Sequence, residues 1–343
     1  YQTANSIRRN YPVVGRFRSF FTHLGEFFRQ YFFAMDREEL PFNRAQRNWA
    51  ERAAENANNT GAFGSTKNLW PEGTVMFANC MFPQLEHEMQ ETSHILFGPY
   101  ARRPYETSAF FNISAMSYGS LSRPAVRALS RGAKQAGIWL NTGEGGLSPW
   151  HLEGGCDIVF QVGTAKYGVR NEQGELSDAR LKELAANPQV KMIELKLSQG
   201  AKPGKGGILP AIKVTEEIAE IRGIPVGKDS ISPNRHPEIS SLGDLLDMIH
   251  RMREVSGLPT VFKAVIGAYG WMDEVFRLVH ERGIASAPDF IAVDSGAGGP
   301  GAGRLRLWGE VGGPIGGALR GGVVGVGVGG WRQRGGGGGG GGG

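Results

Sequence analysis

The sequence predicts an α/β protein whose main part is a (β/α)8 TIM barrel, truncated after about six strands and preceded by a mostly helical N-terminal extension. Apolar strands alternate with amphipathic helices over residues 106–303, and each strand ends in Gly, Ser, Asn or Lys. Polar and glycine-rich loops fall at the carboxyl ends of the strands, whereas ordinary surface turns would be found about equally at both ends of the strands. Continuous apolar strands separated by helices favour a parallel sheet covered by helices, and the loop bias favours a barrel with one shared site.

Three segments of the chain differ in pattern. Residues 1–105 carry short helical patterns broken by proline and asparagine, and we expect a separate layer or arm. Residues 106–303 hold the strand and helix alternation, two units short of a closed barrel, which suggests a truncated or frame-damaged reading. Residues 304–343 are rich in glycine and end in nine consecutive glycines, so we expect disorder there.

An aromatic stretch stands out in the extension. FRSFFTHLGEFFRQYFF (Phe17–Phe33) has polar residues at helical intervals and predicts an amphipathic helix. Such a helix either packs on protein, which we favour, or lies on a membrane surface. No apolar run approaches the roughly 20 residues of a membrane-spanning helix. We expect a cytoplasmic protein, membrane-associated only through this stretch or through a segment upstream of Tyr1.

The elements of the barrel are expected in a regular order. FFNISAM (110–116) predicts the first strand, and Ser122 and Pro124 suit the start of a helix over 122–137. The elements expected after it are, in order, strands IWLNT (138–142), DIVFQV (157–162) and KMIELKL (191–197), a helix over 214–222, a short DSIS (229–232), a helix over 242–255, strand TVFKAVI (260–266), a helix over 272–283 and strand DFIAVD (289–294).

Composition excludes several classes of protein. Lys and Arg exceed Asp and Glu by 38 − 33 = 5, without a basic run typical of nucleic-acid binding, so small anionic molecules are the expected partners. Cys80 and Cys156 are the two cysteines, too few for a disulfide framework or a cysteine-ligated metal site, and a reducing compartment is expected.

Charged residues in the loops after the strands are the candidates for chemistry. QGAKPGKGGILP (199–210) is not a nucleotide-binding loop, because Lys205 is followed by Gly206 and not by Ser or Thr. A lysine there can pair with a substrate carboxylate or remain solvated on a flexible turn. Glu144 lies between glycines, which let a bound ring approach the backbone, although such a carboxylate also serves as a cap. Arg222 either stabilises a helix dipole or binds a dicarboxylate through its fork.

Six motifs in order resemble the FMN-binding domain of the glutamate synthase family, in the short form without the glutaminase domain. The motifs span residues 106–303 and are ISAMSYGSLS, NTGEGG, QVGTAKYGV, QGAKPGKGGILP, ISPNRH and VFKAV. The resemblance implies an FMN barrel that reduces 2-iminoglutarate, formed from 2-oxoglutarate and ammonia, to glutamate by hydride transfer from reduced FMN. It also implies an electron-donor protein or subunit as partner.

The resemblance carries roles onto individual positions. It implies that Glu144 and Lys202 are catalytic, that Gln199, Arg222 and Met116 bind the substrate, and that Ala115, Met116, Asn141, Gln161 and Lys263 bind FMN. A lysine within TVFKAVI is buried and needs a partner, and its charge would stabilise the N1 and O2 edge of reduced FMN. His151 and His236 remain open, with a structural role favoured for His236.

The chain also departs from the family pattern. Ile208 stands where glutamate-forming members usually have Gln, which leaves the keto acid open, and Ala297 and Pro300 replace an acid and a hydroxyl. The cysteines of the iron–sulfur cluster expected in the family are absent from this chain. Two alternatives therefore stand beside the main hypothesis: an inactive barrel fragment, and an FMN-dependent dehydrogenase of another amino acid or amine.

Overall fold

The computed structural model describes residues 13–39, 42–58, 60, 64, 67–72, 74, 76, 79–89, 94–197, 206–265 and 270–294. The chain divides into two compact units, Tyr1–Met81 and Phe82–Gly343, and each is treated by itself below.

The first unit is helical where it is described. Helix α2 (Val14–Phe28) continues into the short π-helix η1 (Arg29–Phe33), which confirms the predicted helix over the aromatic stretch. Helix α3 (Arg44–Ala54) begins at a capping box. The Asn43 side chain accepts a hydrogen bond from the Gln46 backbone N–H, and the Gln46 side chain accepts one from the Asn43 backbone N–H. Among the described residues, no helix is long and apolar enough to cross a bilayer.

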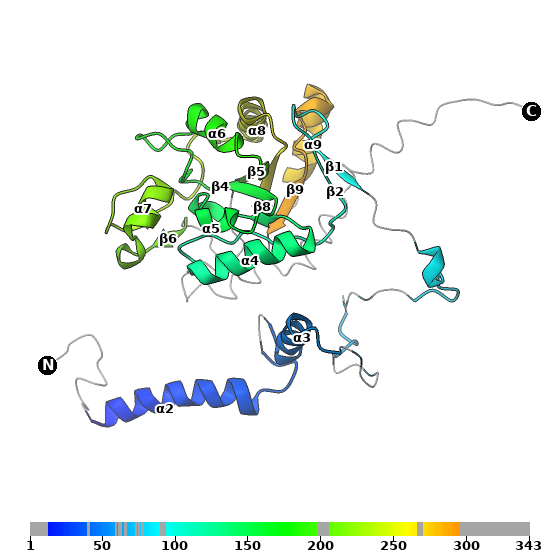
Figure 1. The fold of residues 1–343 in the computed structure, drawn as a ribbon, viewed down its shortest axis with the longest axis vertical. Coiled ribbons are helices and arrows are strands. Elements are labelled where there is room, and N and C mark those ends of the chain that lie inside the picture. Colours follow the sequence, from blue (N-terminus) through cyan, green and yellow to red (C-terminus); the bar gives the residue numbers. More distant parts are fainter. Residues whose placement is uncertain are drawn as a thin grey trace, which may run out of the picture. The chain divides into compact units, whose positions relative to one another are not determined.

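The second unit is built on five parallel strands in the order β3-β4-β5-β8-β9 (Figure 1). Strands that lie in the sheet in the order of the chain, joined by helices, form an arc of a barrel. The α/β class and an arc of parallel strands are thus confirmed, while the eight-fold barrel stays a prediction. The five strands are β3 (Leu140–Asn141), β4 (Ile158–Val162), β5 (Val190–Lys196), β8 (Thr260–Val265) and β9 (Ile291–Asp294).

Helices cover the outer face of these strands. Helix α8 (Leu242–Ser256) contacts both α6 (Asp178–Ala185) and α9 (Trp271–Arg282), and Figure 1 shows the three side by side outside the sheet. Turns of 3-10 helix connect several elements: η2 (Glu86–Glu88), η3 (Gly143–Gly145), η4 (Ala211–Lys213) and η5 (Ile284–Ser286). The helices of this unit are α4 (Arg123–Ala136), α5 (Pro149–Leu152), α6 (Asp178–Ala185), α7 (Glu216–Arg222), α8 (Leu242–Ser256) and α9 (Trp271–Arg282).

Four sequence expectations need correction. The stretch 110–116 contributes one parallel bridge, Ile113 to Leu140, and not a full strand. Helix α6, which the sequence reading omitted, supplies the crossover that two parallel strands require. DSIS forms β7 (Ser230–Ile231), which pairs antiparallel with β6 (Ile208–Leu209) outside the main sheet. Ser122 precedes α4 with extended backbone, but its side chain makes no capping hydrogen bond.

Alternation along the strands sorts the side chains into two faces. Phe160, Leu195 and Phe262 point outward and pack with buried residues of the covering helices, among them Leu245 and Ile249. The residues between them along each strand point to the inner face. Val159 and Met192 lie at its amino-terminal end, packed with Tyr105, Phe97, Trp139 and Phe290.

The aromatic cluster at that end comes partly from a hairpin of β1 (Ile95–Phe97) and β2 (Tyr105–Thr107). The Phe97 ring lies 5.6 Å from Trp139 and 5.2 Å from Phe290, measured between ring centroids. Arg103 anchors the hairpin, because its guanidinium donates to the carbonyl oxygens of Ala185 and Ser256 at 2.7 and 2.8 Å. The hairpin therefore covers the amino-terminal end of the strands, and a site on the inner face must open at their carboxyl ends.

Candidate functional site

The inner face becomes polar toward the carboxyl ends of the strands. Gln161 on β4 and Glu194 on β5 are register partners, and Lys196 on β5 is the register partner of Lys263 on β8. Because residues two apart in a strand share a face, Glu194 and Lys196 point to the same side. The inner face thus passes from apolar side chains, through an amide and a carboxylate, to two lysines.

Three buried side chains form the middle of this face. Glu194 Oε1 accepts hydrogen bonds from Asn141 Nδ2 at 2.9 Å and from Gln161 Nε2 at 2.5 Å. Asn141 Oδ1 accepts a hydrogen bond from the Gly143 backbone N–H at 2.9 Å, which links this row of three side chains, Asn141, Gln161 and Glu194, to the loop that carries Glu144. Gln161 Oε1 is buried and has no hydrogen-bond partner within the described part of the chain. The row therefore leaves one acceptor unsatisfied.

Glu144 lies at the carboxyl-terminal rim, in η3 after β3. Its Oε2 forms an ion pair with Lys196 Nζ at 3.1 Å. A Cβ atom at Gly163 would lie 2.7 Å from Glu144 Cβ, and one at Gly207 would lie 2.7 Å from Glu144 Oε1. Glycine at both positions makes room for the carboxylate, one position after β4 and the other before β6.

Arg222 is brought to the same rim by the last turn of α7. Its side chain is buried, its Nη2 donates to the Tyr118 carbonyl oxygen at 3.3 Å, and its guanidinium carbon lies 5.1 Å from the Tyr167 ring centroid. A Cβ at Gly145 would lie 3.2 Å from Arg222 Nη2, so the guanidinium lies beside the Glu144 loop. Burial lowers the pKa of Arg222, while Tyr167 and the Glu144 carboxylate raise it. Arg222 Nε is buried without a hydrogen-bond partner among the described residues.

Lys263 has the partner that a lysine on an inner strand requires. Its Nζ lies 3.3 Å from Asp294 Oδ1 on the neighbouring strand β9, and the Lys263 side chain is 12% exposed. The pair leaves the ammonium at the rim end of the inner face, next to Lys196. A ligand seated over the inner face would meet this cation at one edge.

Met116 and Ala115 lie in the loop that precedes α4, and both are half-buried. The Met116 amide donates to the Asn141 carbonyl oxygen at 3.0 Å, and the Met116 carbonyl accepts from His151 Nε2 at 2.8 Å. His151 is fully buried and its Nδ1 lies 2.7 Å from Ser148 Oγ. His151 therefore has a structural place, holding the backbone of the predicted flavin-contacting loop.

His236 is also buried behind the site. Its Nε2 donates to the Lys196 carbonyl oxygen at 2.8 Å, which fixes the last residue of β5. Burial, with a smaller contribution from the nearby Lys166 ammonium, lowers the pKa of His236 to about 4. The imidazole is therefore neutral near pH 7, which suits the structural role favoured for it.

Two predicted residues, Gln199 and Lys202, lie outside the described residues. The other predicted residues lie on or beside one rim: Ala115, Met116, Asn141, Glu144, Gln161, Arg222 and Lys263. The sequence reading missed Lys196, which forms an ion pair with Glu144, and Glu194, which accepts a hydrogen bond from Gln161. Their spacing was a usable signal, because two charges two positions apart in an apolar strand indicate one polar face.

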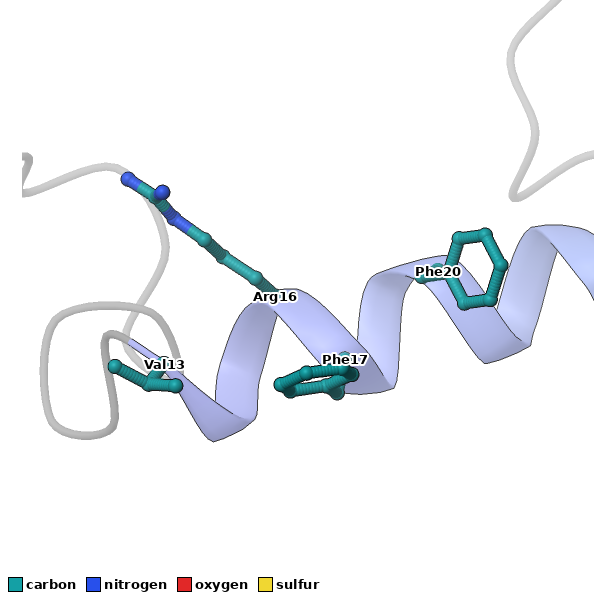
Figure 2. Close-up of a pocket in the computed structure, with 4 residues that line it drawn as sticks. All are labelled: Val13, Arg16, Phe17 and Phe20. Atoms are coloured by element: carbon teal, nitrogen blue, oxygen red, sulfur yellow. The ribbon is translucent and has the colours of Figure 1, made fainter.

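Other parts of the molecule offer weaker candidates. Figure 2 shows a hollow along α2, lined by Val13, Arg16, Phe17 and Phe20 from a single helical stretch. It holds none of the predicted site residues and no carboxylate. Within the described ranges, no group of three or more His, Cys, Asp or Glu side chains could hold a metal ion.

Comparison with known proteins gives an independent result. A family model described as the conserved region in glutamate synthase matches residues 69–333. The chain is 37% identical over 353 residues to the glutamate synthase large subunit-like protein of Bacillus subtilis, covering 92% of this chain and 66% of that protein. It is 35% identical over 202 residues to the archaeal-type glutamate synthase [NADPH] of Thermotoga maritima, covering 59% of this chain and 36% of that protein. The chain thus spans less than two thirds of the length of these relatives.

Proposed function

This chain belongs to the glutamate synthase family, and we propose that it is an FMN-dependent oxidoreductase that reduces 2-iminoglutarate, formed from 2-oxoglutarate and ammonia, to glutamate. The observation that carries the proposal is the joint placement of Glu144, Lys196 and Arg222 at one rim of a parallel sheet. Carboxyl-terminal rims of such sheets are where barrel enzymes hold their reactive groups.

The inner face fits a flavin. Gln161 Oε1 is a buried acceptor in need of a donor, and the pyrimidine edge of FMN carries one ring N–H. Lys263 supplies a cation near the same row, where it would bind the N1 and O2 edge. Asn141, Gln161 and Lys263 would therefore hold the ring, with Ala115 and Met116 from the neighbouring loop.

The substrate would be held by cations at the rim. Arg222 offers a guanidinium whose Nε has no protein partner among the described residues, and a carboxylate of the substrate would satisfy it. Lys202 would take the second carboxylate and Gln199 would assist, as the family resemblance implies. Two fixed charges would orient a dicarboxylate and lower the entropic cost of reaching the transition state.

Proton handling would fall to Glu144 and Lys196. The Glu144 carboxylate is held by the Lys196 ammonium and by close glycines, so its position is fixed before the substrate arrives. From there Glu144 would orient ammonia, accept a proton from its nitrogen as it attacks the keto carbon, and return that proton to the keto oxygen, which leaves as water when the imine forms. Reduced FMN, when bound, supplies the hydride that reduces the imine.

Anaerobic reoxidation tests the proposal. The protein loaded with FMN is reduced under nitrogen, and 2-oxoglutarate and ammonium are then added. We expect the flavin absorption to return and glutamate to form in equal amount. Reoxidation by a different keto acid would instead support a dehydrogenase of another amino acid, and a folded protein that retains no FMN would support the inactive fragment.

A substitution in the lysine loop sharpens this test. We predict that Lys202→Met abolishes turnover and leaves the flavin spectrum intact, because the residue would bind the substrate and not the ring. Turnover within a few-fold of the wild type would show that the loop has been assigned wrongly. Lys213→Met, in η4 and outside the predicted site, is the matched control and should turn over normally.

A further inference from the structure

The row across the inner face holds a buried carboxylate that the assigned site does not use. Glu194 is 4% exposed, and its two hydrogen bonds within the described residues come from neutral amides, those of Asn141 and Gln161. A carboxylate in such a place is costly unless its hydrogen bonds are made. We therefore consider how Glu194 affects the orientation of these two side-chain amides.

An ionised carboxylate only accepts hydrogen bonds, so it fixes which end of each amide faces it. Asn141 is fixed twice, because its Nδ2 donates to Glu194 and its Oδ1 accepts from the Gly143 amide. Gln161 is fixed once: its Nε2 faces Glu194, and its Oε1 is turned away, buried and without a described partner. The orphaned oxygen is thus a consequence of Glu194.

We propose that Glu194 is a positioning residue for the flavin: it orients the Gln161 amide so that Oε1 accepts the pyrimidine N–H of FMN. This inference rests on the proposed function, since it needs a flavin over the inner face. Without Glu194 the Gln161 amide is free to rotate by half a turn and present its NH2 group, which cannot accept that hydrogen bond. A buried acceptor without a donor destabilises the protein, so a hydrogen bond from the ring N–H would favour flavin binding.

A flavin that lacks the N–H provides the test. FMN and N3-methyl FMN are titrated into the protein freed of flavin, and dissociation constants are taken from flavin fluorescence together with absorption spectra. We expect the wild type to bind FMN at least tenfold more tightly than N3-methyl FMN. Glu194→Met, which has similar length but no oxygen to accept from the two amides, should bind FMN about tenfold more weakly than the wild type and discriminate between the two flavins by less than threefold.

Further variants separate orientation from charge. Glu194→Asp keeps the charge but is too short to hold both amides, so it should lose discrimination as Glu194→Met does. It also serves if Glu194→Met does not fold. Adding Glu194→Met to Gln161→Leu should change FMN affinity by less than twofold, because Glu194 would act through Gln161.

The outcomes distinguish this inference from the proposed function. FMN binding by the wild type with equal affinity for the methylated flavin would overturn the inference and leave the proposed function standing. Discrimination that survives in Glu194→Met or Glu194→Asp would show that Gln161 needs no orienting partner and would overturn the inference as well. A folded wild type that binds neither flavin would overturn both.

Discussion

At the scale of single residues, glycine matters as much as charge in this site. Gly163 and Gly207 approach Glu144 so closely that no other residue leaves its carboxylate where Lys196 holds it. The two glycines come from segments that flank different strands, and each removes a side chain from the space that the carboxylate fills. The space for the Glu144 carboxylate therefore depends on glycine at two positions that are far apart in the sequence.

The variant Gly207→Ala tests whether glycine is needed to leave room for the Glu144 carboxylate. The added Cβ would lie 2.7 Å from Glu144 Oε1, the end of a flexible side chain, so the fold should survive while the carboxylate moves away from Lys196. We predict at least a tenfold loss of glutamate formation with a melting temperature close to that of the wild type. Gly132→Ala is the control, because an added Cβ there meets no atom within 4 Å. Wild-type turnover in Gly207→Ala would mean that the position of Glu144 is not critical.

The residue scale also shows what the sequence could and could not reveal. The expectation that Lys263 needs a partner was sound, but its partner, Asp294, could be named only from strand register. Glu194 and Lys196 are missed because KMIELKL is interpreted as a uniformly apolar buried strand, whereas the inner face is polar toward the carboxyl end of this strand. Arg222 could be interpreted as a helix-end charge or as a ligand for carboxylates, and its burial beside the Glu144 loop favours the second.

At the scale of elements, β5 connects the outer core to the site. Its outward side chains pack under α8, its inward ones carry Glu194 and Lys196, and its last carbonyl accepts from His236. The sequence predicted β5, α8 and β8 well because their hydrophobic patterns are long. It missed α6, an eight-residue helix, and misread 110–116, where one bridge replaces a strand. Short elements are fixed by their tertiary neighbours and leave little pattern.

The histidine behind β5 makes stability depend on pH. The pKa of His236 is lowered to about 4 in the folded state, against roughly 6.5 when unfolded. The unfolded chain therefore binds more protons between these values, and the stability conferred by the neutral imidazole is present above pH 6.5 and is lost as pH falls toward 4. A shift of this size corresponds to about 3 kcal/mol. His151, whose pKa burial also lowers, acts in the same direction.

We predict that urea unfolding shows this dependence and that His236→Gln weakens it. The wild type should lose free energy of unfolding steadily between pH 6.5 and 4.5, and the variant should lose less over the same interval. His250→Gln changes an exposed histidine and should reproduce the wild-type curve. Parallel curves for wild type and His236→Gln would contradict the assignment of the pH dependence to this imidazole.

At the scale of the whole molecule, the inner face changes in character from one end of the strands to the other. Aromatic side chains close the amino-terminal end, buried amides and a carboxylate occupy the middle, and lysines, Glu144 and Arg222 lie at the open end. The same gradient suits a ring seated over the middle and an anionic substrate at the rim. The sequence predicted the polar rim from its loops, but the aromatic closure depends on a hairpin formed within residues assigned to the extension.

Truncation tests where the barrel unit begins. A chain that starts at Phe82 should remain folded, because it keeps the β1–β2 hairpin and its contacts with Trp139 and Phe290. A chain that starts at Glu106 loses Phe97, Arg103 and Tyr105, and we predict a loss of at least about 4 kcal/mol in the free energy of unfolding, typical of removing one large buried aromatic. Equal stability of the two truncated chains would place the hairpin outside the folded unit.

We propose that flavin and substrate share one site at the carboxyl-terminal rim, with Arg222 holding the substrate. The most direct measurement is a titration of 2-oxoglutarate into the FMN-loaded protein, followed by the flavin difference spectrum. We expect a saturable change in the flavin band that Arg222→Gln abolishes while FMN remains bound. Binding of 2-oxoglutarate, seen by calorimetry, that leaves the flavin band unchanged would contradict it.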